Sequence, residues 1–267
     1  ALLAYCIAEV GSPSMLVNEL RAIDPSLVDW RPSGLAFGAL GFGLYLTSWI
    51  AAGFGVVGQP HILIRIMSIR SRTDIRRARL VYFLWYVPFS VAAVGVALYS
   101  RILLPDVQEF DPELALPRLA QQFMPGVLVG LVLAGLFSAT MSTADSQLLT
   151  SSAAATLDLP RRQMPYLVTK LTTLVFAGFA LVIAITAPAS VFELVIIAWS
   201  GLASALGPLL IIRLFRWPLP TRVGLAMITA GVGTAATWRF VLQYGNEVYE
   251  ALPGMLAGAV VYFIAWW

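Results

Sequence analysis

The sequence predicts an all-α membrane protein, and three observations support this class. Of the 267 residues, 59% are hydrophobic and only 12% are charged, whereas a soluble domain is about 45–50% apolar. Apolar stretches of about 20 residues, the length that crosses a bilayer as a helix, recur along the chain. The charged residues lie mainly between these stretches. A membrane β-barrel is excluded, because its strands are shorter and alternate in polarity.

The predicted helices follow one another within a single transmembrane domain, residues 1–267. We expect a helical stub followed by seven spans, at residues 1–10, 34–64, 80–101, 121–157, 167–187, 190–212, 223–243 and 252–267. The proline-rich connection after the second span is expected to form short surface or re-entrant helices. The chain starts without Met and stops on an apolar stretch, so we interpret it as part of a longer protein.

Basic and acidic connections alternate along the chain. Twelve of the 17 Lys and Arg residues fall in three segments, 65–79, 161–170 and 213–222. Acidic residues gather instead in the segments 19–29, 106–113 and 247–250. The positive-inside rule assigns the basic segments to the cytoplasm. The first complete span therefore runs inward, and the direction alternates from there.

The pattern is first interrupted at AAGFGVVGQPHIL, residues 51–63. Gly53, Gly55, Gly58 and Pro60 remove side-chain bulk and one backbone donor, which favours a break in the helix. A break at membrane depth frees carbonyl and amide groups that can bind a ligand. The alternative is that the glycines allow close helix packing. The neighbouring His61 has no second ligand at metal spacing, so we interpret it as structural.

Hydroxyl groups interrupt the pattern a second time, in GLFSATMSTADSQLLTSSAAA, residues 135–155. Ser142 and Thr143 follow Ala139 by three and four positions, so both hydroxyls lie over the turn of the Ala139 carbonyl. Three neutral oxygens on one patch suit a hard cation such as sodium. Two alternatives stay open: hydroxyls bonded to their own helix, and small residues packed against another helix.

Asp145 and Ser146 extend the same helix face by one turn. Asp145 is the only acid deep inside one of the seven predicted spans, since Glu193 lies three residues from the start of its own span. An acid at membrane depth costs about 2.5–3.5 kcal/mol even on the lenient insertion scale. We therefore expect Asp145 to face a cavity, a cation or a basic partner.

The pattern is interrupted a third time at VFELVIIAWSGLASALGPLL, residues 191–210. Trp199, Ser200, Gly201 and the pair Gly207–Pro208 indicate a flexible, partly polar helix that could act as a gate. The chain contains no phosphate-binding loop, HExxH, GxSxG or paired-cysteine motif. No catalytic residues are predicted, and the chain is not expected to be an enzyme.

Three motifs resemble the sodium/solute symporters, and among them the sodium/proline branch. These motifs are GQPHILIRIM at 58–67, ATMSTADSQLLTSSAA at 139–154 and AWSGLASALGPLL at 198–210. The resemblance implies a LeuT-like inverted-repeat transporter fold, represented here by the second repeat and flanking helices. It also implies that the helices of the first repeat belong to the same protein but are missing from this chain.

The resemblance implies sodium as the coupling ion and assigns it to Ala139, Ser142 and Thr143. A second cation site falls on Ser142, Asp145 and Ser146. Asp145 departs from the family pattern, because a carboxylate stands where relatives carry a hydroxyl. It could strengthen a cation site, bind a proton or pair with a basic residue of a missing helix.

The resemblance also implies the place of the substrate. The substrate-binding residues it suggests are Ala52, Gly55, Val56, Gly58, Gln59, Pro60, Trp199 and Ser200. Ala52 and Val56 replace a Trp and a Tyr of the proline branch, so a larger or less selective pocket is expected.

The function that this resemblance implies is sodium-coupled import of a small organic solute by alternating access. Proline, another amino acid, or a small carboxylate such as pantothenate fits the description. A transporter-like input domain of a signalling protein is the alternative from another class. The expected location is a bacterial inner membrane, with lipid and the solute as partners and no nucleic acid.

Overall fold

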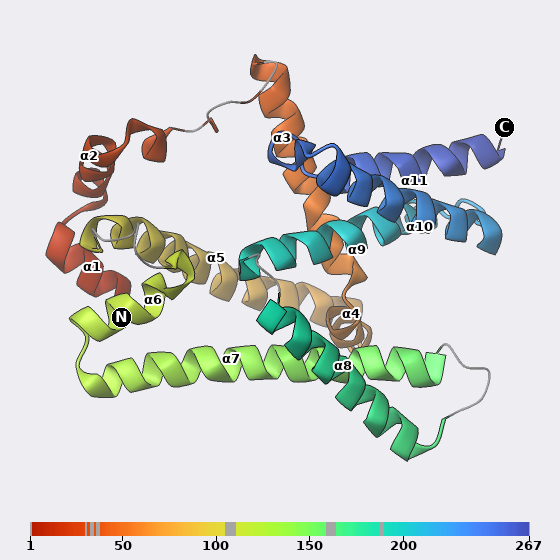
Figure 1. Cartoon of the computed structure of the whole chain (residues 1–267), viewed down its shortest axis with the longest axis horizontal. Helices are drawn as coiled ribbons and strands as arrows, with labels where there is room; N and C mark the ends of the chain where they lie inside the picture. Colours follow the sequence, from red (N-terminus) through yellow and green to blue (C-terminus); the bar gives the residue numbers. More distant parts are fainter. Residues whose placement is uncertain are drawn as a thin grey trace. The chain divides into compact units, whose positions relative to one another are not determined.

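The computed structural model is helical over the part of the chain it describes, which comprises residues 2–29, 31–32, 35, 38–104, 111–158, 164–186 and 190–266 (Figure 1). Contacts between residues divide the chain into two compact units. Unit 1 comprises Ala1–Ser33 and Ile69–Ser146, and unit 2 comprises Gly34–Ser68 and Gln147–Trp267. The boundary falls within one long helix, α7.

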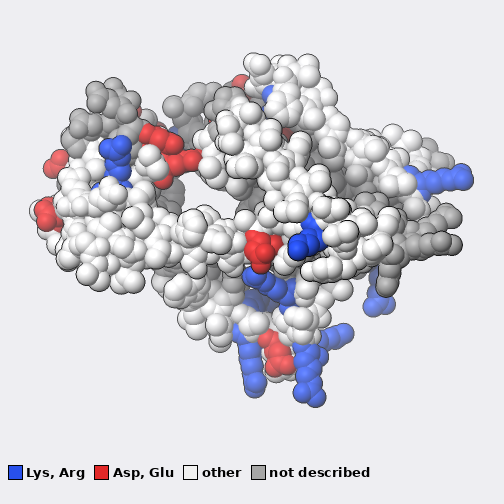
Figure 2. All heavy atoms as spheres, turned by 60° about the horizontal axis from the view of Figure 1, so that its bottom comes forward, with Lys and Arg blue, Asp and Glu red and all other residues white. Residues whose placement is uncertain are grey.

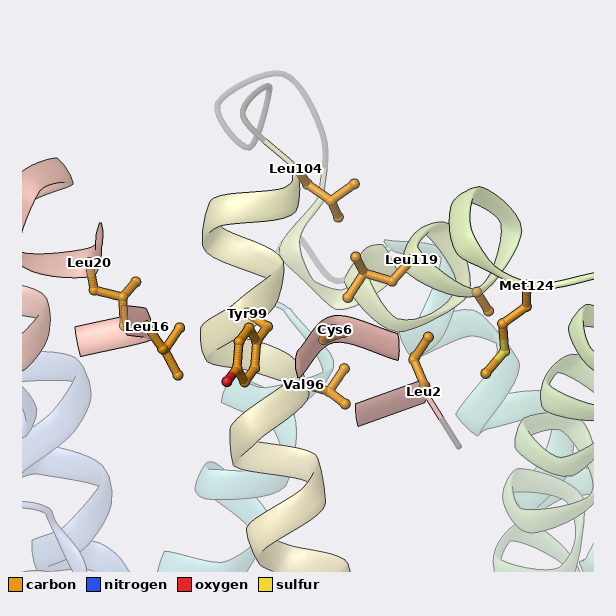
Figure 3. Packing of buried hydrophobic residues seen from close by; sticks show 10 residues of the cluster. Leu2, Cys6, Leu16, Leu20, Val96, Tyr99, Leu104, Leu119 and Met124 are labelled. Atoms are coloured by element: carbon orange, nitrogen blue, oxygen red, sulfur yellow. The ribbon is translucent and has the colours of Figure 1, made fainter. Parts of the chain in front are cut away.

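Unit 1 is built from five helices and two 3-10 turns. They are α1 (Leu2–Val10), α2 (Pro13–Ile23), a turn at Pro25–Val28, α5 (Arg72–Leu103), a turn at Pro112–Leu114, α6 (Ala115–Phe123) and most of α7 (Gly126–Ala153). Side chains of α1, α2, α5 and α6 form its core (Figure 3). The Tyr99 hydroxyl of α5 donates a 2.9 Å hydrogen bond to the Gly11 carbonyl. Gly11 has a positive φ of 104°, which ends α1 and lets α2 turn back.

Unit 2 contains the remaining helices. They are α3 (Gly38–Ala52), the 3-10 helix η2 (Gly53–Gly58), α4 (Pro60–Met67), the end of α7 with a π-helical turn at Ala154–Asp158, α8 (Tyr166–Thr186), α9 (Val191–Leu214), α10 (Thr221–Ala236), a π-helical turn at Thr237–Val241, a 3-10 turn at Tyr244–Asn246 and α11 (Ala251–Trp266).

Small residues allow α9, α10 and α11 to lie side by side in unit 2 (Figure 1). A Cβ atom added at Gly231 of α10 would lie 3.1 Å from the Gly254 carbonyl oxygen of α11. A Cβ atom added at Gly258 of α11 would lie 3.3 Å from the Met227 carbonyl oxygen of α10. Such close backbone approach is the usual way in which membrane helices gain packing contacts.

The helices are apolar on surfaces that no other described residue covers. Five helical segments in the described part of the chain are long and apolar enough to cross a membrane: Gly38–Gly58, Arg72–Leu103, Gly126–Asp158, Tyr166–Thr186 and Val191–Leu214. Trp85 on α5 is 73% exposed. Most of the visible face in Figure 2 carries no charge, and the charged side chains form separate groups. An apolar surface of this extent needs lipid, so the chain is a multi-pass integral membrane protein.

The helix bounds differ from the predicted spans where a capping residue or a proline, and not hydropathy, determines where a helix begins or ends. The helix α5 begins at Arg72, eight residues before the predicted span, because Ser71 caps it: the Ser71 hydroxyl accepts the Asp74 amide at 3.1 Å. Pro125 separates α6 from α7 within the predicted segment 121–157, since proline lacks the amide that would continue α6. The helix α6 follows the proline-rich connection, where short helices are expected; residues 105–110 lie outside the described residues.

Candidate functional site

The helix that begins at Gly38 is interrupted where glycine and proline predict a break. The helix α3 ends at Ala52, and η2 continues as a 3-10 helix to Gly58. Gln59 is extended, with φ −89° and ψ 108°, and α4 begins at Pro60. The Gln59 amide donates to the Val56 carbonyl at 3.2 Å, and Val56 is half-buried. The break redirects the chain and leaves the Gln59 side chain beside it.

The broken segment packs closely on α9. A Cβ atom at Gly55 would lie 2.5 Å from the Trp199 carbonyl oxygen. One at Gly58 would lie 2.8 Å from the Leu202 Cβ atom. Only glycine fits at these two positions without moving α9. Both interpretations of the glycines therefore apply: the helix is interrupted at this segment, and the segment packs tightly on α9.

A pocket of about 540 Å³ lies beside the break within unit 2. Three segments line it. The residues are Gly58, Gln59 and His61 from the break and α4, Gln147, Thr150 and Ser151 from the end of α7, and Val191, Leu194, Val195, Ala198, Trp199 and Leu202 from α9. Apolar walls with a few polar groups are typical of a small-molecule site.

Five of the eight residues proposed for substrate binding separate into two groups. Gly58, Gln59 and Trp199 line the pocket, and Trp199 is 36% exposed. Ala52 is buried in a cluster with Ala203, Tyr249 and Ala251, and Ser200 is 3% exposed. The Ser200 hydroxyl donates to the Ile197 carbonyl of its own helix at 2.9 Å. Ala52 and Ser200 thus pack the surroundings and do not line the pocket.

Four polar lining residues were not singled out as site residues from the sequence. Gln147, Thr150 and Ser151 stand at positions i, i+3 and i+4 of α7, so they share one helix face. This spacing is the sequence signal that indicates that the three side chains belong to one site. His61, interpreted as structural, lies at the pocket and is half-buried.

The oxygens proposed for sodium lie together on α7, in unit 1. The Thr143 hydroxyl donates to the Ala139 carbonyl at 3.0 Å, and the Ser146 hydroxyl donates to the Ser142 carbonyl at 2.9 Å. Ser142 and Thr143 are exposed in this chain. A threonine in any helix can form such a bond to its own backbone. The bond places two of the three predicted oxygens side by side.

Asp145 is exposed on the same helix. Over the residues that the structure describes, no three His, Cys, Asp or Glu side chains cluster at a distance suited to a metal. Hydroxyl and carbonyl oxygens and this one carboxylate are therefore the cation ligands that α7 offers. Such a set suits an alkali ion better than a transition metal.

Tyr249 joins three elements of unit 2. It lies in the connection between α10 and α11 and is 4% exposed. Its amide donates to the Ser48 hydroxyl of α3 at 3.1 Å, and its own hydroxyl donates to the Ile196 carbonyl of α9. Its ring stacks on Trp49 of α3, with centroids 5.0 Å apart and planes at 8°. Burial, and then the nearby Glu250 carboxylate, raises the pKa of the Tyr249 hydroxyl to about 12.

Glu250, the residue after Tyr249, is buried and forms an ion pair with the partly exposed Arg239. The Arg239 guanidinium lies 3.1 Å from Oε1 of Glu250, and the two side chains are 23% and 1% exposed. Oε2 of Glu250 has no hydrogen-bond partner among the described residues. A buried carboxylate that depends on one cation makes this connection sensitive to the loss of Arg239.

Comparison with known proteins identifies the relatives of this chain. The model of a family described as the sodium:solute symporter family matches residues 1–233. The osmoregulated proline transporter OpuE of Bacillus subtilis is 29% identical over 96% of the chain and 54% of its own length. The high-affinity proline transporter PutP of the same species is 29% identical over 96% of the chain, and the sodium/proline symporter 2 of Staphylococcus saprophyticus is 30% identical over 97%.

The chain spans about half the length of these curated relatives. Their names describe transporters, in agreement with the prediction that the chain is not an enzyme. The comparison with solved structures found no match.

Proposed function

The chain belongs to the sodium:solute symporter family, and on this premise we propose that it is part of a symporter that imports proline or another amino acid with sodium. The observation that carries the proposal is the interrupted helix, packed on α9 beside a pocket of about 540 Å³. Relatives named as proline transporters support the choice of solute. Ala52 and Val56 are smaller than the aromatic residues of the proline branch, which leaves other amino acids and small carboxylates as solutes.

Sodium is the co-transported ion in this proposal, and the Ala139 carbonyl with the Ser142 and Thr143 hydroxyls would bind it. The Thr143 proton is directed to the Ala139 carbonyl. The lone pairs of the Thr143 hydroxyl are therefore free for a cation on the outer side of that bond. Three oxygens are fewer than a hard cation needs, so the other ligands would come from helices of the first repeat.

Asp145 and Ser146 are proposed to hold a second cation one turn further along α7. A carboxylate there would bind the ion more strongly than a hydroxyl. Asp145 also gives the site a group that could exchange a proton, so the second cation is sodium or a proton.

The proposed mechanism is alternating access in a LeuT-like fold. The helices from α3 to α9 would form the second repeat, and α10 and α11 the flanking helices. Sodium between α7 and the first repeat would favour the outward-open state, in which η2 and α4 are ordered for solute binding. Coupling arises because the ion and the solute each stabilise one state over the other. The relatives are bacterial, so we place the protein in the inner membrane with its basic connections in the cytoplasm.

Uptake of labelled L-proline into proteoliposomes tests the proposal. We expect uptake to require an inward sodium gradient and to fall strongly in Ser142→Ala and Thr143→Ala. Thr172→Ala is the matched control, because Thr172 is a partly exposed threonine of α8 that donates to the Val168 carbonyl of its own helix at 2.9 Å. Uptake that is indifferent to sodium, or alanine variants at 142 and 143 that match the control, would overturn the assignment.

A further inference from the structure

The pocket beside the break has two chemically different sides. The side formed by α9 is apolar: Val191, Leu194, Val195, Ala198 and Leu202, with the Trp199 ring. Apart from the indole N–H of Trp199, every polar lining group of a side chain comes from the break, α4 and the end of α7. A ligand that fits such a pocket has a hydrocarbon part and one polar end.

Among the lining residues that the structure describes, the polar side offers hydrogen-bond donors and no acid. Gln59, His61, Gln147 and Ser151 each carry at least one N–H or O–H donor. Thr150 donates its proton to the Gln147 carbonyl at 3.1 Å, so it adds no donor. Asp145 is two positions before Gln147, and residues two apart on a helix do not share a face. A group of donors without a carboxylate is complementary to an anion.

Local structure leaves the donors of Gln59 available to a ligand. Gln59 is the N-cap residue of α4, and its side chain makes no capping hydrogen bond. The Gln59 carbonyl already accepts the Ile62 and Leu63 amides, both at 3.1 Å. The side-chain amide therefore has no structural task at the helix start, and it lies at the pocket with His61.

We propose that Gln59 and His61 bind the carboxylate of the solute, with Gln147 and Ser151 adding donors from α7. The hydrocarbon part of the solute then contacts α9. Among the described lining side chains only that of His61 can carry a positive charge, so His61 is the specificity-determining residue of this site. The pocket selects acids over the corresponding amides, since a carboxylate accepts from every donor and an amide does not. The assignment rests on the proposed transport function, whose solute it restricts to carboxylates.

The test compares the binding affinities of an acid and of its amide for the purified protein in nanodiscs, at saturating sodium. Binding of L-proline and L-prolinamide is measured by calorimetry for wild type, His61→Ala, His61→Gln and Gln147→Leu, with Thr172→Ala as control. We expect wild type and the control to prefer the acid. His61→Ala should lose about tenfold in affinity for L-proline and little for L-prolinamide. His61→Gln should recover part of the loss, because glutamine keeps an N–H donor.

Gln147→Leu guards against misfolding at the break, because Gln147 is exposed on α7 and leucine favours a helix. It should weaken L-proline binding a few-fold with the same bias toward the acid. Equal losses for both ligands would show a merely structural role and overturn the assignment. So would a wild-type protein that binds the amide as well as the acid.

If neither ligand binds, lactate and lactamide are compared next, and a wild type that binds neither acid overturns the assignment. Failure of the transport proposal has a different signature. Uptake without sodium dependence, together with an intact preference for acids, would refute sodium coupling and leave the carboxylate site standing.

Discussion

Replacing Tyr249 by phenylalanine isolates one hydrogen bond that links the α10–α11 connection to α9. The ring and its stacking on Trp49 stay, and only the hydroxyl that donates to the Ile196 carbonyl is lost. A single hydrogen bond of this kind contributes about 1 kcal/mol net. For 150–250 residues, that corresponds to a fall of about 2–4 °C in apparent melting temperature.

Tyr249→Ala extends the same perturbation to the ring. Removing a buried aromatic side chain costs about 3–5 kcal/mol, so this variant should melt far below Tyr249→Phe. Tyr166→Phe is the control, because Tyr166 is 82% exposed. Thermal unfolding in one detergent compares all four proteins. Equal melting temperatures for Tyr249→Phe and Tyr166→Phe, with only a small effect of Tyr249→Ala, would refute the role given to Tyr249.

The pKa of Tyr249 gives the same variant a second readout. The folded value of about 12 lies above the value of about 10 for a free tyrosine. The contribution of the neutral phenol is therefore complete below about pH 10 and is lost as the pH rises through about 12. A difference titration of wild type against Tyr249→Phe should show one tyrosine that ionises late. A difference centred near pH 10 would contradict the burial of this hydroxyl.

Two further substitutions test packing in unit 2. Gly55→Ala should destabilise the protein by about 1–3 kcal/mol, because the added Cβ atom meets the Trp199 carbonyl. Gly53→Ala is the control and should be neutral, because its added Cβ atom meets nothing within 4 Å. Equal melting temperatures of the two variants would argue against the close contact. Arg239→Ala leaves the Glu250 carboxylate buried and unpaired, so the free energy of unfolding should fall by about 3–5 kcal/mol, measured by chemical or thermal unfolding. Adding Glu250→Gln to this variant should restore most of that loss. A double variant no more stable than Arg239→Ala would contradict this pairing.

Much of the helix pattern is predictable because it depends on local composition. Apolar runs place α8 and α9 close to their observed bounds. The break after Ala52 is likewise local, since three glycines and Pro60 act within one segment. The helix start at Arg72 is missed because a hydropathy pattern ignores the Ser71 cap, although the sequence contains it.

The pocket is harder to predict, because it depends on how distant segments pack. Gln59 and Gln147 are far apart in the sequence, and only the fold of unit 2 brings both to one pocket. Tyr249 is an extreme case, since its amide partner Ser48 lies 201 positions away. Ala52 and Ser200 lie in the matching motifs but do not line the pocket. A motif match thus indicates the neighbourhood of a site but not which side chains face it.

The sodium dependence of uptake in two Thr143 variants tests the central claim most directly. Initial rates of L-proline uptake are measured against sodium concentration for wild type, Thr143→Ser and Thr143→Ala. If α7 holds the coupling ion, Thr143→Ser keeps a half-saturating sodium concentration close to wild type, and Thr143→Ala raises it about tenfold. The same half-saturating concentration in all three proteins would contradict sodium binding at this turn of α7.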